Sequence, residues 1–229
     1  KHIWFDFSET IAFLKKERHD RLRYETYSEI IGKPINDELI AEYENLYKKY
    51  NHSNAAIFCS LGLSSNYWSE RISTVPAGEL YTLADEAIPE ILKKIKKIVP
   101  ISLFSNIQLG NILPNLGVNI DLFTHVLSSG MLKEPKPALE GYHKMVELSV
   151  LPPNEILYIG DDVGKDVLPA KKVGILSGLM WTKAKEADYC FDKELYIQKE
   201  TQNKSSLKLG GTLLPRKDFA LILMDQFFH

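Results

Sequence analysis

Side chains that could do phosphate chemistry follow apolar segments at four places in this chain. Asp6 ends the apolar run Ile3-Trp4-Phe5, and Ser8 comes two residues later. The other places hold Ser105 with Asn106, then Lys133-Glu134-Pro135-Lys136-Pro137, then Asp161 with Asp162 and Asp166. Each place alone is typical of a turn or a helix cap. Because four of them occur in this order, each at a predicted strand end or helix start, we interpret them as one site.

Strands that alternate with helices must bring these places together. Apolar segments typical of buried strands are VPISLF, THVLSSGML, EILYIG and ILSGLMW, and helical segments such as LADEAIPEILKKIKKI and PALEGYHKMVELSV lie among them. This alternation predicts an α/β fold with a parallel sheet. Ligands of such sheets bind beyond the carboxyl ends of the strands, which is where the polar residues fall.

Residues 12–76 have a different, helical pattern. Leu39, Tyr43, Leu46 and Tyr50 recur at helical spacing, and Asn36 or Asp37 is a candidate N-cap. We find no convincing strand in this segment. Because one strand precedes it, we expect a helical cap, residues 12–76, inserted into a core made of residues 1–11 and 77–229, with 200–229 as a tail of uncertain structure.

The composition narrows the class of protein. The 229 residues are 45% hydrophobic and 25% charged with a formal charge of −2, which predicts a globular fold and argues against binding to nucleic acid or a membrane surface. Cys59 and Cys190 lie far apart and are interpreted as free thiols of a reducing compartment. Without an apolar run of membrane-spanning length or a signal-peptide pattern, we expect a cytoplasmic protein, as a monomer or a homodimer.

The four motifs resemble those of the haloacid dehalogenase superfamily. They read DFSET, LFSN, EPKPALEGY and GDDVGKD, and the resemblance covers roughly residues 1–195. Members are mostly phosphatases with a Rossmann-like core and a cap inserted after the first strand. The resemblance therefore implies the same α/β architecture and a small phosphorylated metabolite as substrate.

The resemblance also implies a role for each motif residue. Asp6 would attack phosphorus and form an aspartyl-phosphate, with Mg²⁺ held by Asp6, the backbone carbonyl of Ser8, and Asp161. Asp166, with Asp162 as a further candidate, would hold metal-bound water and orient the lysine. Phosphoryl oxygens would be bound by Lys136, the Ser105 hydroxyl and the Asn106 backbone N–H. Hard carboxylate ligands without Cys or clustered His suit Mg²⁺ better than zinc.

The choice of lysine has two candidates. Counting forward to Tyr142 selects Lys136, whereas counting from Gly130 selects Lys133. We favour Lys136, because Pro137 would begin the helix whose N-terminal amides also attract phosphate.

Ser8 departs from the family pattern, which has a second Asp at this position. That Asp protonates the leaving oxygen and then activates water, and a serine hydroxyl has no suitable pKa for either step. Acid–base groups contribute roughly 10²–10⁴ in rate, so slow turnover is expected. Glu9 is adjacent, but strand alternation would point it away.

Three functions remain open. The first is a Mg²⁺-dependent phosphatase slowed by Ser8, and the second is a non-catalytic phosphate-binding or regulatory protein. The third is a phosphonatase-like C–P hydrolase in which Lys48 or Lys49 forms a Schiff base. The basic segment KKERHDRLRYETY is interpreted mainly as a solvated helix face, with one or two side chains as alternative ligands of an anionic leaving group.

Overall fold

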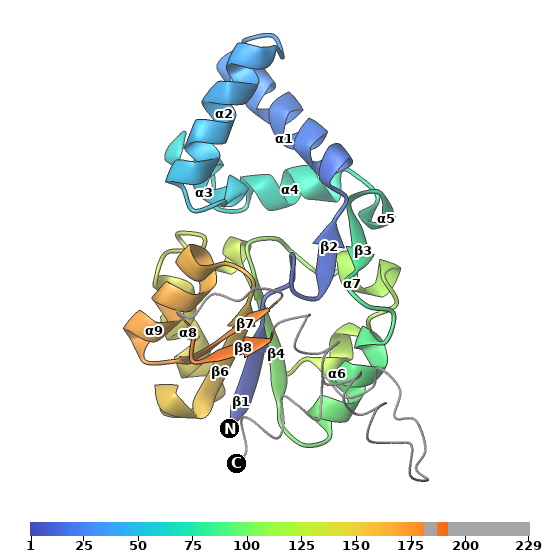
Figure 1. The fold of residues 1–229 in the computed structure, drawn as a ribbon, viewed down its shortest axis with the longest axis vertical. Helices are drawn as coiled ribbons and strands as arrows, with labels where there is room; N and C mark the ends of the chain where they lie inside the picture. The colour runs from blue at the N-terminus through green and yellow to red at the C-terminus, as the bar shows by residue number, and fades with distance from the viewer. Residues whose placement is uncertain (181–186, 192–229) are drawn as a thin grey trace, which may run out of the picture.

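The computed structural model describes residues 1–180 and 187–191. The predicted tail, residues 200–229, lies outside this range. Among the described residues, the main sheet has six parallel strands in the order β5-β4-β1-β6-β7-β8 (Figure 1). The strands are β1 (His2–Phe5), β4 (Ile101–Ser105), β5 (Val126–Ser128), β6 (Ile156–Gly160), β7 (Leu176–Met180) and β8 (Tyr189–Phe191). The predicted α/β fold with a Rossmann-like parallel sheet is confirmed.

Helices cover both faces of this sheet, with α6 (Ile88–Lys96) and α7 (Ile112–Asn115) on one face and α8 (Glu140–Ser149) and α9 (Leu168–Val173) on the other (Figure 1). Side chains of β1 alternate between the faces, as expected for a strand. Ile3 and Phe5 belong to the larger apolar cluster, which includes α6 and α7, whereas Trp4 packs in the smaller cluster with Tyr142 and Met145 of α8.

A helical insertion, defined here as Lys16–Ser73, follows the first strand and contains α1 to α4. Its helices are α1 (Lys16–Ile31), α2 (Asp37–Lys49), α3 (Asn54–Ser60) and α4 (Tyr67–Ser73). Gly32 ends α1 in the left-handed conformation that glycine adopts without strain, with φ 68°. The N-cap of α2 is Asn36, whose side chain accepts a hydrogen bond from the Leu39 N–H at 2.9 Å.

The expectation that residues 12–76 contain no strand was wrong. β2 (Ala12–Leu14) pairs antiparallel with β3 (Tyr81–Leu83), and this two-stranded ribbon joins the helical insertion to the main sheet (Figure 1). The strand is three residues long and its partner lies on the far side of the insertion, so the local sequence carried no alternation to reveal it. A short helix, α5 (Ala77–Leu80), precedes β3.

The helices among the described residues are too short or too polar to be membrane spans.

Candidate active site

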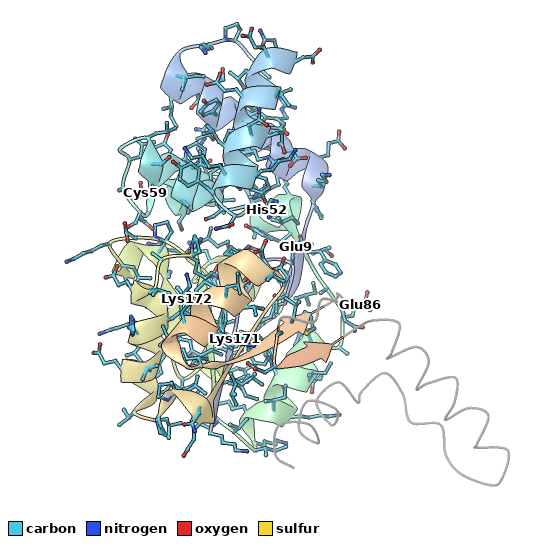
Figure 2. The ribbon with its side chains drawn as sticks, turned by 60° about the vertical axis from the view of Figure 1, so that its left-hand side comes forward. Glu9, His52, Cys59, Glu86, Lys171 and Lys172 are labelled. Atoms are coloured by element: carbon cyan, nitrogen blue, oxygen red, sulfur yellow. The ribbon has the colours of Figure 1, made fainter. Side chains whose placement is uncertain are left out.

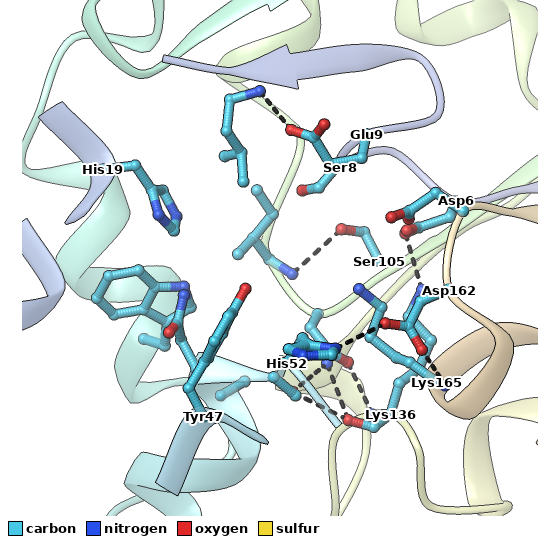
Figure 3. A pocket seen from close by; sticks show the side chains of 18 of the residues that line it. Asp6, Ser8, Glu9, His19, Tyr47, His52, Ser105, Lys136, Asp162 and Lys165 are labelled. Atoms are coloured by element: carbon cyan, nitrogen blue, oxygen red, sulfur yellow. Dashed lines mark hydrogen bonds and ion pairs between the residues drawn. The ribbon is translucent and has the colours of Figure 1, made fainter. Parts of the chain in front are cut away.

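The predicted acidic residues converge at the carboxyl end of the main sheet. Asp6 follows β1, Asp161 follows β6, and Asp166 lies one turn later. One carboxylate oxygen from each of the three lies within 4.8 Å of the others. Ser105 ends the neighbouring strand β4, and its side chain lines the same cavity (Figure 3).

Lys136 is the lysine that reaches this cluster. Its side chain is 1% exposed, and Nζ donates to Asp6 Oδ1 at 2.8 Å, Asp166 Oδ1 at 2.9 Å and the Tyr158 hydroxyl at 2.6 Å. Lys133 is exposed. The choice of Lys136 agrees with this placement, but its stated reason was wrong, because α8 begins at Glu140 rather than at Pro137.

Hydrogen bonds to its backbone hold Lys136 in place. The Lys136 N–H donates to Asn106 Oδ1 at 2.7 Å, and its carbonyl accepts from Asn106 Nδ2 at 3.0 Å. The same carbonyl accepts from the Ser53 hydroxyl of the helical insertion at 3.1 Å. The Asn106 side chain therefore positions Lys136, a role that the sequence analysis did not assign to it.

The Gly-Asp motif after β6 is shaped around Asp166. Asp166 Oδ2 accepts from the N–H groups of Asp161 and Asp162 at 3.3 and 3.2 Å, while Oδ1 binds Lys136. A Cβ atom on Gly160 would lie 2.5 Å from the Asp166 carboxyl group. Glycine is needed at position 160 because any side chain would push Asp166 away from the lysine. A π-helical turn, Val163–Val167, carries Asp166 inward.

The three carboxylates are held close together at an electrostatic cost. Burial raises the pKa of Asp6. Burial also raises the pKa of Asp161 to about 8, and the nearby charges of Asp166 and Asp6 raise it further. Burial also opposes ionisation of Asp166, but Lys136 and Lys165 outweigh it and lower its pKa. Asp161 Oδ1 is buried without a hydrogen-bond partner. Hard oxygen donors with an unpartnered buried oxygen fit a divalent cation such as Mg²⁺.

Ser8 occupies the position two residues after Asp6 and lines the cavity. Tyr81 of β3 lines the same cavity, and burial raises the pKa of Tyr81 well above its usual value. Glu9 does not continue an extended strand, so the alternation argument applied to it was wrong. Its φ is 59°, and its Oε1 accepts from the Leu14 N–H at 2.8 Å.

A cavity of about 310 Å³ lies over these residues and beneath the helical insertion, a size suited to a small metabolite. Its insertion side is lined by His19, Tyr47, His52, Ser53, Asn54, Ala55 and Trp68. His52 and Glu9 mark the junction between insertion and sheet in Figure 2. Lys48 and Lys49, the candidates for a Schiff base, are not among the lining residues.

The basic segment of α1 contributes one side chain to the cavity, His19. Arg18 pairs with Glu79 at 3.5 Å, Arg21 with Glu25 at 2.7 Å, and Arg23 with Glu44 at 2.7 Å. The arginines are thus engaged by acidic residues of the insertion and α5. Lys15, Lys16 and Arg21 are exposed, as expected for a solvated helix face, whereas His19 and Arg23 are buried, which that interpretation did not predict.

Sequence reasoning missed Lys165, His52 and Tyr158. Lys165 lies inside the GDDVGKD motif and lines the cavity (Figure 3). Burial opposes its charge, but Asp161, Asp166 and other carboxylates raise its pKa, so it remains an ammonium. His52 stands in a helix break and Tyr158 in a buried strand, so neither carried a local signal of function.

Replacing Lys136 with methionine should destabilise the protein by about 3–5 kcal/mol, because a buried ion pair that loses one partner leaves an uncompensated charge. Urea unfolding without divalent ions measures this free energy. Lys133→Met is the matched control and should leave it within about 0.5 kcal/mol of wild type, as expected for an exposed position. Equal stability of the two variants would contradict the role given to Lys136.

A family model described as haloacid dehalogenase-like hydrolase matches residues 1–174. A search of curated proteins found no match. Among solved structures, a HAD phosphatase from Thermococcus onnurineus is 19% identical, covering 93% of this chain and 100% of its own, with a TM-score of 0.61.

Two further structures have ligands named with them. The putative HAD-hydrolase YfnB from Bacillus subtilis, bound to magnesium, is 16% identical over 86% of this chain and 97% of its own, with a TM-score of 0.54. CbbY from Rhodobacter sphaeroides, in complex with phosphate, is 19% identical over 83% of this chain and 92% of its own, with a TM-score of 0.54. At these identities the likeness shows a shared fold.

Proposed function

This chain belongs to the haloacid dehalogenase-like hydrolase family, and from that premise we propose that it is a Mg²⁺-dependent phosphatase of a small phosphorylated metabolite. The observation that carries the proposal is the convergence of Asp6, Asp161 and Asp166 on one point beside Lys136. The solved structures with magnesium and with phosphate belong to proteins of the same fold, which supports this choice of cofactor and substrate class.

Asp6 is the nucleophile in this proposal. Its carboxylate attacks phosphorus and forms an aspartyl-phosphate, and water then releases inorganic phosphate and restores the carboxylate. A carboxylate that approaches a phosphate dianion meets like-charge repulsion, so positive charge must surround the phosphoryl group. Lys136 and Lys165 supply two ammonium groups, and the Ser105 hydroxyl and the Asn106 N–H supply hydrogen bonds.

Asp6, Asp161 and the backbone carbonyl of Ser8 would hold the magnesium ion, with Asp166 holding a metal-bound water. When bound, the ion neutralises the repulsion between the nucleophile and the phosphoryl oxygens. The unpartnered Asp161 Oδ1 supports a cation at this place. The raised pKa values of Asp6 and Asp161 are a further support, because a divalent ion would relieve the packing of three carboxylates.

Turnover is expected to be slow because Ser8 stands where the family pattern has its acid–base carboxylate. Ser8 and Tyr81 both line the cavity, and neither hydroxyl exchanges a proton readily near neutral pH. The hypothesis of a non-catalytic phosphate-binding protein rests on this same residue. The C–P hydrolase hypothesis loses support, because the described cavity lining holds neither Lys48 nor Lys49.

The test is a panel of small phosphate monoesters incubated with the protein in single-turnover conditions, with MgCl₂ or with EDTA. We expect phosphate release that requires magnesium, and a phosphorylated protein that acid quenching traps. A protein that is inert across the panel, yet is thermally stabilised by Mg²⁺ together with inorganic phosphate, would replace this proposal by the non-catalytic one.

A further inference from the structure

The loss of the acid–base carboxylate at position 8 leaves a proton-transfer role to fill. Other groups of the described cavity are poorly suited to it. Glu9 is tied to the Leu14 N–H, and burial together with the nearby Arg23 lowers the pKa of His19 to about 3, so that it stays neutral. The Tyr81 hydroxyl holds its proton far above neutral pH because it is buried.

His52 differs from these groups because it has a carboxylate partner. Its Nδ1 lies 3.1 Å from Asp162 Oδ2, across the junction between the helical insertion and the loop after β6 (Figure 3). Asp162 is itself fixed, because its Oδ1 accepts from the Lys165 N–H at 2.8 Å. A carboxylate on Nδ1 sets the tautomer and the orientation of the ring, and leaves Nε2 free to exchange protons.

Packing also holds the His52 ring at the cavity. The ring meets the Tyr47 ring edge-on, with centroids 5.2 Å apart, and both residues line the cavity. The side chain is 54% exposed, so water can reach it. Asn51 and His52 both adopt left-handed backbone conformations, with φ 50° and 57°, which are uncommon for residues with side chains and occur more often at functional sites.

We propose that His52, positioned by Asp162, is the acid–base residue of the reaction assigned above, on which this inference rests. In the first step, an Asp6 oxygen bonds to phosphorus, the bond to the leaving oxygen breaks, and that oxygen takes its electron pair and the proton of Nε2. In the second step, Nε2 takes a proton from water, whose oxygen bonds to phosphorus as the bond to Asp6 breaks. One water is consumed, and the imidazolium is restored for the next cycle.

If His52 is the acid–base residue, proton transfer requires the helical insertion to be in contact with the main sheet. His52 comes from the insertion and Asp162 from the sheet, so the pair exists only when the two are in contact. The hydrogen bond from Ser53 to the Lys136 carbonyl couples the same loop to the phosphate-binding lysine. Substrate release by an opened insertion would therefore also separate the acid–base pair.

His52→Asn is the decisive variant. An asparagine amide can still donate to Asp162, and asparagine tolerates the left-handed backbone of position 52, so the contact and the fold are retained while proton transfer is lost. With 4-nitrophenyl phosphate, whose leaving group needs no proton, we expect a burst of one nitrophenolate per protein molecule. Steady-state kcat should then fall roughly 10²-fold, and KM should fall with it because the aspartyl-phosphate accumulates, so that kcat/KM changes little.

Ser8→Asp supplies a second readout, because it should restore turnover to His52→Asn by returning a carboxylate to the family position. A mere structural contact at His52 predicts wild-type kcat for the asparagine variant, and that result would overturn the inference while leaving the proposed phosphatase intact. If His52→Asn lost the nitrophenolate burst and steady-state turnover to the same extent, that result would also overturn the inference. If wild type and Asp6→Asn are equally inert, the proposed function fails first, and the inference with it.

Discussion

Replacing Asp6 with asparagine is expected to lower Mg²⁺-dependent phosphate release by on the order of 10⁴-fold or more, to the level of the solvent reaction. An amide oxygen is a far weaker nucleophile than a carboxylate, and an acyl-phosphate cannot form on it. The measurement is single-turnover release of phosphate from the best ester of the panel, paired with acid trapping of the phosphorylated protein. Trapped phosphate should be absent from the variant.

Unfolding should not explain this loss. The Asp6 carboxylate is packed beside those of Asp161 and Asp166, and burial raises its pKa, so a neutral amide is better tolerated than a charge at this position. Thermal unfolding without divalent ions should therefore occur at the wild-type temperature or above it. Phosphate release by Asp6→Asn at the wild-type rate would remove Asp6 as the nucleophile.

The sheet and its polar edge were predictable because their signals are local. Apolar runs such as that before Asp6 mark strands, and parallel strands place their carboxyl ends at one edge. That rule predicts that Asp6, Ser105 and Asp161 lie close together, although none of their contacts is known from the sequence. No such rule predicts the hydrogen bonds to the Lys136 backbone, because their donors Asn106 and Ser53 lie far from Lys136 in the sequence.

The parts that were missed depend on contacts between distant segments. β2 exists because it pairs with β3 across the whole helical insertion, and three residues are too few to show a strand period. The role inferred for His52 depends on Asp162, a partner 110 positions away. The left-handed turn at Glu9 broke the alternation on which its predicted direction was based.

One electrostatic pattern connects these contacts. The arginines of α1 are paired with acids of the insertion and α5, whereas Lys136 and Lys165 are directed to the carboxylate cluster. Positive charge is therefore concentrated where a phosphoryl group would bind rather than on the insertion side of the cavity.

Ser8→Asp should raise kcat, by less than the roughly 10²–10⁴ that a positioned acid–base group contributes where none is present, because His52 already transfers protons in the wild type. Ser8 already lines the cavity two residues after Asp6, so a carboxylate there can reach the leaving oxygen and the attacking water. The buried Tyr81 hydroxyl lines the same cavity and can donate a hydrogen bond to the new carboxylate.

The matched control is Ser8→Asn, which has nearly the shape of Asp but cannot transfer a proton at neutral pH. It should keep the slow wild-type turnover, so any gain seen with Asp is assigned to proton transfer rather than to side-chain size. The kcat of both variants is measured on an alkyl phosphate, because a poor leaving group makes protonation matter most. A kcat for Ser8→Asp that is equal to or below that of Ser8→Asn would mean that the serine does not limit turnover, and that proton transfer by His52 is already sufficient.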